Sequence, residues 1–102
     1  MKEHRYAVTL THLETADGEK PGRETLKLEV GNHDDIFRIM DLTEKAGILP
    51  PEEARAFVLG LKLFADVTMK HRDEPLFAGM KPQLTEIIRS LKSEIKARVP
   101  QP

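Results

Sequence analysis

The chain has 102 residues, with 16 Lys and Arg against 17 Asp and Glu, four His and no Cys. Its length fits one domain over residues 1–102, and its net charge of −1 argues against nucleic acid or a membrane surface as a partner. Without Cys the chain can form no disulfide, thiol nucleophile or iron–sulfur cluster. No apolar run approaches the roughly 18 residues of a membrane-spanning helix. We therefore expect a small cytoplasmic protein that folds around one modest core.

The first thirty residues have the pattern of a β-hairpin. Apolar and polar residues alternate from His4 onward, and the alternation resumes from Thr25 to Val30. The intervening stretch contains Asp17-Gly18 and Pro21-Gly22, which are typical of turns. The spacing predicts an antiparallel hairpin over residues 4–30 with one apolar and one polar face.

The rest of the chain predicts three helices, at about 33–46, 51–71 and 82–98, followed by a frayed tail at 99–102. Asn32 is the expected N-cap of the first helix and Gly47 its stop signal, while Pro51 and Pro82 open the other two. Residues 74–79 have the composition of a break that holds at most one helical turn. The sequence therefore predicts an α+β fold of order ββααα, in which the middle helix is central.

The middle helix is apolar on two sides. One face is expected to point to the core and comprises Ala54, Phe57, Val58, Leu61, Phe64, Ala65 and Thr68. A second face carries Ala56, Leu59, Leu63 and Val67, and either the last helix or another subunit must cover it. The last helix would do so through Leu84, Ile88, Leu91 and Ile95. Gly60 is unfavourable inside a helix, so we expect another backbone to approach it closely.

The residue types that carry chemistry are sparse and dispersed. No nucleophile–base pair, phosphate-binding loop or converging set of metal ligands is present, so we predict no cofactor and no metal. The four His are explained by strand faces and helix ends. A pocket between the hairpin and the helices, using His33, His71 and Asp73, is the arrangement that a ligand-binding or catalytic role would require.

Four segments, taken together, resemble a known family. They are His4-Arg5-Tyr6, residues 32–37 (Asn-His-Asp-Asp-Ile-Phe), residues 59–64 (Leu-Gly-Leu-Lys-Leu-Phe) and residues 72–77 (Arg-Asp-Glu-Pro-Leu-Phe). In this order, over roughly residues 4–92, the chain is similar to a family of small bacterial proteins known only as a domain of unknown function. The resemblance implies a bacterial cytoplasmic α+β domain, and it brings no activity, cofactor or catalytic residue with it.

Two classes of function follow from these observations. The first is a non-enzymatic interaction module that self-associates as a dimer and binds an unidentified protein, through the second face of the middle helix. The alternative is a small-ligand-binding protein or enzyme with the pocket near His33 and His71. Neither hypothesis involves nucleic acid or a membrane.

Overall fold

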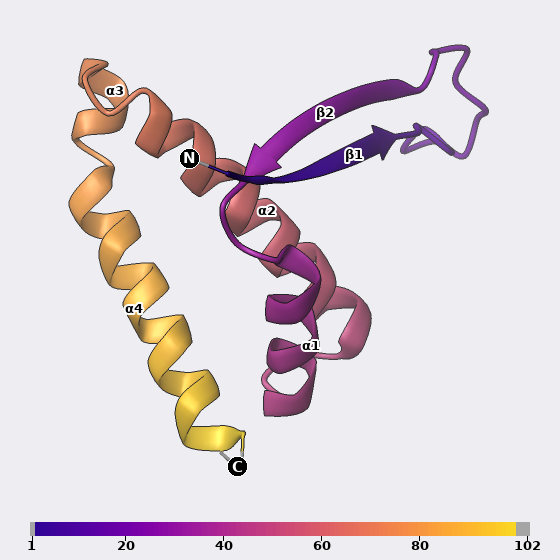
Figure 1. The fold of residues 1–102 in the computed structure, drawn as a ribbon. Coiled ribbons are helices and arrows are strands. Elements are labelled where there is room, and N and C mark those ends of the chain that lie inside the picture. The colour runs from indigo at the N-terminus through magenta and orange to yellow at the C-terminus, as the bar shows by residue number, and fades with distance from the viewer. Residues whose placement is uncertain (1, 100–102) are drawn as a thin grey trace. The chain divides into compact units, whose positions relative to one another are not determined.

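The computed structural model describes residues 2–99, and these contain two strands and four helices (Figure 1). The chain forms two compact units, residues 1–34 and 35–102, and each is described by itself. An antiparallel hairpin comes first and the helices follow, so the predicted α+β class is confirmed. One short helix is added to the three that the sequence predicts.

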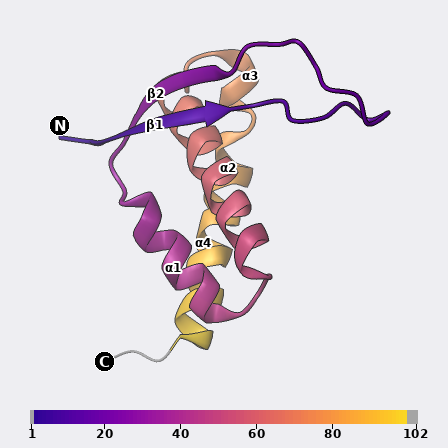
Figure 2. The ribbon, with the colours of Figure 1, turned by 90° about the vertical axis from the view of Figure 1, so that its right-hand side faces the viewer.

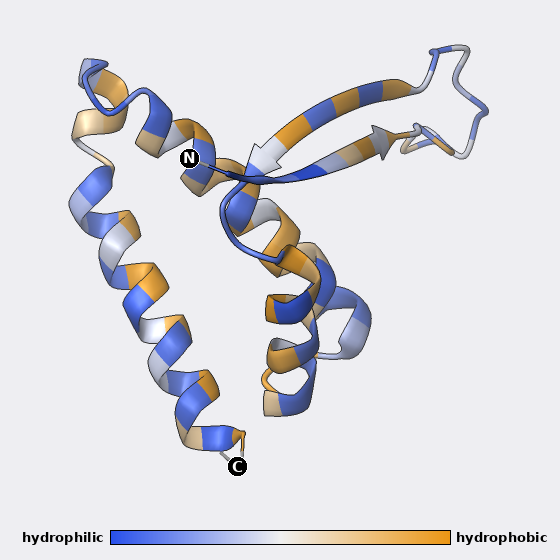
Figure 3. Cartoon of the chain, in the orientation of Figure 1, coloured by the Kyte–Doolittle hydropathy of each residue, from blue (hydrophilic) through white to orange (hydrophobic). Residues whose placement is uncertain are grey.

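The first unit is a two-stranded hairpin of β1 (His4–Leu10) and β2 (Leu26–Asn32). The strands run side by side in both views (Figures 1 and 2). In the antiparallel register Val8 lies opposite Leu28. Apolar and polar residues alternate along β2, as Figure 3 shows. One face of the hairpin is therefore apolar, and its members are Tyr6, Val8, Leu10, Leu26, Leu28 and Val30.

A long loop, residues 11–25, joins the two strands. At its base the hydroxyl groups of Thr11 and Thr25 form a hydrogen bond of 3.0 Å. At its tip Gly18 has a φ of 86° and donates its backbone N–H to the Thr15 carbonyl at 3.0 Å. Because this φ is left-handed, the glycine of the predicted Asp17-Gly18 turn is needed there.

The second unit begins with α1 (Ile36–Ala46), which starts later than the sequence predicts. Asp35 is its N-cap and accepts the backbone N–H of Arg38 at 3.2 Å. The Asn32 side chain instead accepts the N–H of Asp34 at 2.9 Å, so it closes a turn after β2 rather than capping the helix. Gly47 ends α1 in the left-handed conformation, with a φ of 68°.

The remaining helices are α2 (Pro51–Lys70), α3 (Pro75–Ala78) and α4 (Lys81–Arg98). The helix α2 packs along α1 and also contacts α3 and α4, while α1 contacts α4. Within the second unit α2 is therefore the shared element, which agrees with its predicted central place. None of the helices in residues 2–99 combines the length and hydropathy that crossing a bilayer requires.

The buried side of α2 is shifted around the helix relative to the predicted core face. Its buried residues are Ala54, Val58, Leu61, Lys62, Ala65 and Thr68. Phe57 and Phe64, which we expected on the same face, remain 41% and 42% exposed. Each lies one position before a buried residue, so its side chain projects about 100° around the helix from that neighbour. Within the helical unit, both rings therefore lie outside the set of buried residues.

The helix α4 packs on the face of α2 that was predicted to point to the core, and not on the second face with Leu59 and Leu63. The side chains of Leu61, Ala65 and Leu84 form the core cluster, and Ile88 and Leu91 pack against it. The last helix therefore uses its predicted apolar stripe, but it meets the row of Leu61 and Ala65. Val99 is the C-cap of α4 and is buried; the other residues of the predicted tail, 100–102, lie outside the described residues.

Candidate functional site

An exposed apolar stripe runs along α2, beside its buried row. Phe57, Phe64 and Val67 are 41%, 42% and 48% exposed, and they recur with Gly60 at intervals of three and four residues. This spacing places all four residues on one face of the helix. We call this set, Phe57, Gly60, Phe64 and Val67, the α2 stripe.

Gly60 makes a notch in the α2 stripe. Outside its own helix backbone and chain neighbours, no described atom lies within 4 Å of the place where a Cβ on Gly60 would stand. The close backbone approach expected at Gly60 is therefore not made by any described part of this chain. Because Phe57 precedes Gly60 by three positions and Phe64 follows it by four, the missing side chain leaves a gap between two large rings.

The candidate surface from the sequence lies partly beside this stripe. Val67 is shared by both sets, and Ala56 is also exposed, whereas Leu59 and Leu63 are half-buried. The predicted core face included Phe57 and Phe64, which are the two largest exposed side chains of α2. The seven-residue spacing of Phe57 and Phe64 could not have revealed their exposure, because the buried residues Leu61 and Thr68 have the same spacing.

The residues of the alternative pocket lie in exposed turns. His33 follows β2 in the first unit, while His71 is the C-cap of α2 and Asp73 lies in the turn after it. The His71 carbonyl accepts the Glu74 backbone N–H at 2.9 Å, and its ring lies 6.4 Å from that of Phe77. These contacts give His71 a structural role in the turn after α2. A pocket that unites the three remains a hypothesis.

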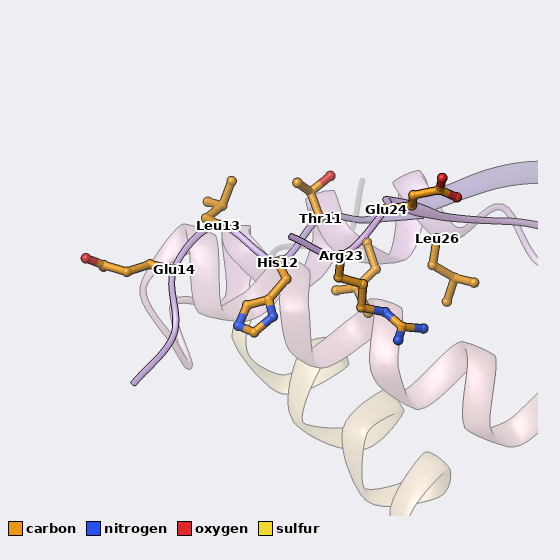
Figure 4. A pocket seen from close by; sticks show the side chains of 8 residues that line it. Thr11, His12, Leu13, Glu14, Arg23, Glu24 and Leu26 are labelled. Carbon is orange, nitrogen blue, oxygen red and sulfur yellow. The ribbon is translucent and has the colours of Figure 1, made fainter. Parts of the chain in front are cut away.

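A hollow that the sequence did not predict lies where the hairpin opens into its loop (Figure 4). It is open to solvent, has a volume of about 550 Å³ and is lined by Leu10, Thr11, His12, Leu13, Glu14, Arg23, Glu24 and Leu26. His12 and Arg23 point to one side, whereas Thr11 and Glu24 point to the other (Figure 4). Since two carboxylates accompany the one guanidinium, the lining has no pronounced preference for anions. Among residues 2–99, no group of three or more His, Asp or Glu is placed to hold a metal ion.

The polar face of the hairpin carries charges of both signs. Arg5 donates to Glu29 across the strands at 3.1 Å, between side chains that are each 76% exposed. Lys27, on the same face of β2, stands opposite Thr9 and makes no ion pair with the described residues. The strand therefore presents a lysine and a glutamate two residues apart.

One solved structure gives a close comparison. It is the crystal structure, at 2.20 Å resolution, of a protein of unknown function from Pectobacterium atrosepticum. The two chains superpose with a TM-score of 0.76 and share 29% sequence identity, over 90% of this chain and 99% of the other. The comparison with curated proteins found no match.

A family model matches nearly the whole described chain. It covers residues 4–93, which include both strands and all but the end of α4. The matched range agrees with the resemblance that the four sequence segments indicate. The chain therefore belongs to DUF3861, a family defined as a domain of unknown function with a solved structure.

Proposed function

We propose that this protein is a non-enzymatic interaction module, which binds another protein through the α2 stripe and associates with a second copy of itself. The observation that carries the proposal is the exposure of Phe57 and Phe64 along α2, directly beside the residues that form the core. Large aromatic side chains bury much apolar area and dominate binding energy at interfaces. Two such rings around a notch are suited to receive an apolar side chain.

The notch at Gly60 favours a helical partner. A helix that docks on α2 can place one apolar side chain over Gly60, because no described side chain, its two chain neighbours aside, lies within 4 Å of the position that a Cβ on Gly60 would take. Amphipathic helices present such side chains every three or four residues. We therefore propose an amphipathic helix of another protein as the ligand of the α2 stripe, and we place the module in the bacterial cytoplasm. The source of the solved relative, Pectobacterium atrosepticum, supports the bacterial origin alone.

The test compares what is bound by three forms of the protein. The double variant Phe57→Glu/Phe64→Glu places two charges on the stripe, and Ile87→Glu is the matched control because Ile87 is 47% exposed on α4. We expect the wild type and Ile87→Glu to capture the same bacterial protein. The double variant should fail to capture it, although the circular dichroism of the double variant stays native. An identical captured set for all three folded proteins would overturn the proposal.

A further inference from the structure

The outer edge of β2 has a pattern that is complementary to itself. Within residues 2–99, β1 and β2 pair only with each other, so each has one edge without a strand partner. An unpaired edge presents a row of backbone donors and acceptors to another strand, and a hairpin of two strands is marginally stable in isolation. The question is which strand fits the edge of β2.

We infer that β2 pairs antiparallel with β2 of a second copy, around a two-fold axis at Leu28. In this register Lys27 stands opposite Glu29 of the second copy, and Glu29 stands opposite its Lys27, because residues equally distant from Leu28 face each other. Opposite charges on directly facing residues stabilise a strand pair. The inference rests on the proposed self-association and names the edge and register that produce it.

The neighbouring registers are disfavoured by the same charges. In an antiparallel pair, two facing residues point their backbone groups either both toward the partner strand or both away from it. Facing positions in two copies of one strand therefore differ by an even number, so the two-fold axis passes through a residue and moves in steps of one residue. An axis at residue 27 sets the two lysines opposite each other, and an axis at residue 29 sets the two glutamates opposite each other. Like charges directly opposite are destabilising. Among these three registers, the pattern selects the one centred on Leu28.

The apolar face supports the same register. Leu26 then faces Val30 of the second copy, and Leu28 faces its own counterpart, so all these apolar side chains lie on one face of a four-stranded sheet. Leu26 and Leu28 are 42% and 44% exposed in the single chain. Pairing widens the apolar face from two strands to four, and it removes two of the four strand edges of the separate chains from solvent.

The edge of β1 lacks this complementarity. Among Lys, Arg, Asp and Glu, the strand β1 contains only Arg5. No acidic residue lies within β1, so no antiparallel register of β1 with itself brings opposite charges together. The charge pattern therefore distinguishes β2 as the edge that pairs.

A charge-exchange series tests the register, with the mass of each protein measured by light scattering. We expect the wild type to be a dimer and Lys27→Glu to dissociate roughly tenfold more readily. The triple variant Lys27→Glu/Glu29→Lys/Arg5→Glu should recover the dimer, because it restores opposite charges across the β2 edge and keeps an ion pair between positions 5 and 29. Lys20→Glu, which makes the same charge change in the loop, should stay dimeric. A monomeric wild type would overturn self-association itself. A dimer that is equally stable in all four proteins would overturn only the β2 edge.

A crosslinking experiment gives a second reading that does not depend on the folding of a charge variant. Because the chain has no Cys, a single introduced Cys can form only an intermolecular disulfide. Leu28→Cys meets its counterpart on the axis at a Cα separation of about 4.5–5.5 Å, which a disulfide spans, whereas Leu26→Cys faces Val30 of the second copy. We expect rapid disulfide formation for Leu28→Cys and slow formation for Leu26→Cys, which is equally exposed. Equal rates, or a faster rate for Leu26→Cys, would overturn the inference.

Discussion

Arg55 of α2 holds the carboxylate of Glu44 of α1 with two hydrogen bonds. Its Nε donates to Oε2 at 3.2 Å and its Nη2 donates to Oε1 at 3.1 Å. The Glu44 side chain is 21% exposed, so this carboxylate is better sheltered than those of the two ion pairs within α4, Arg89–Glu86 and Arg98–Glu94. A two-pronged contact of this kind fixes the relative orientation of the helices that carry the partners.

Removal of the Arg55 side chain should therefore destabilise the helical unit more than removal of an exposed arginine. Arg89→Ala is the matched control, because Arg89 pairs with Glu86 within α4 and both side chains are more than 60% exposed. We expect Arg55→Ala to lower the urea midpoint further than Arg89→Ala does. Equal urea midpoints for the two variants would show that the pair between α1 and α2 contributes no more stability than an exposed ion pair.

The stability that this pair contributes should not change between neutral pH and about pH 10. The hydrogen bond to Glu44, and then its negative charge, raise the pKa of Arg55 above its ordinary value. A group whose pKa is raised by folding contributes stability below its unfolded pKa and loses it as the pH rises through the folded pKa. Both values lie in the strongly alkaline range, so the difference between wild type and Arg55→Ala should be constant over this window. A difference that falls between pH 7 and about pH 10 would contradict this account.

Leu84 should be a principal source of stability in the helical unit. It is 3% exposed and lies in the core cluster with Leu61 and Ala65. Leu84→Ala leaves a cavity and should cost about 2–5 kcal/mol in the free energy of unfolding, while Ile87→Ala, on the exposed side of α4, should cost under about 1 kcal/mol. Urea unfolding measures both. Similar costs would mean that α4 packs through another face.

Substitution of two glycines by alanine should change the stability of the protein in opposite directions. Gly47 has a left-handed φ of 68°, so Gly47→Ala should destabilise by about 1 kcal/mol. Gly60 lies inside α2 with open space at its Cβ position, so Gly60→Ala should stabilise by about 0.5–1 kcal/mol. Gly60→Ala should also weaken binding of the helical partner, since the new methyl group occupies the notch. A stabilised variant with unchanged partner binding would remove Gly60 from the proposed site.

Local patterns in the sequence predicted most of the fold. The alternation around Val8 and Leu28 identified the hairpin, Gly47 ended the first helix, and Pro51 and Pro82 marked the next helix starts. The start of α1 was misplaced because Asn32 and Asp35 are both good N-cap residues, and the turn after β2 decides between them.

The candidate site was harder to predict, for a physical reason. A helix with apolar residues on most of its circumference does not reveal which of them its neighbours cover. Phe57 and Phe64 are as apolar as Val58 and Ala65, and only the positions of α1 and α4 make the second pair the buried one. The hollow near His12 and Arg23 depends on the course of a loop that has no periodic pattern.

Sedimentation equilibrium of the unmodified chain tests self-association most directly. One chain has a mass of 11.6 kDa. The account predicts twice this mass at micromolar concentration, and partial dissociation as salt is raised, because ions screen the exposed contacts between Lys27 and Glu29. A single species of 11.6 kDa at every concentration and ionic strength would contradict the account.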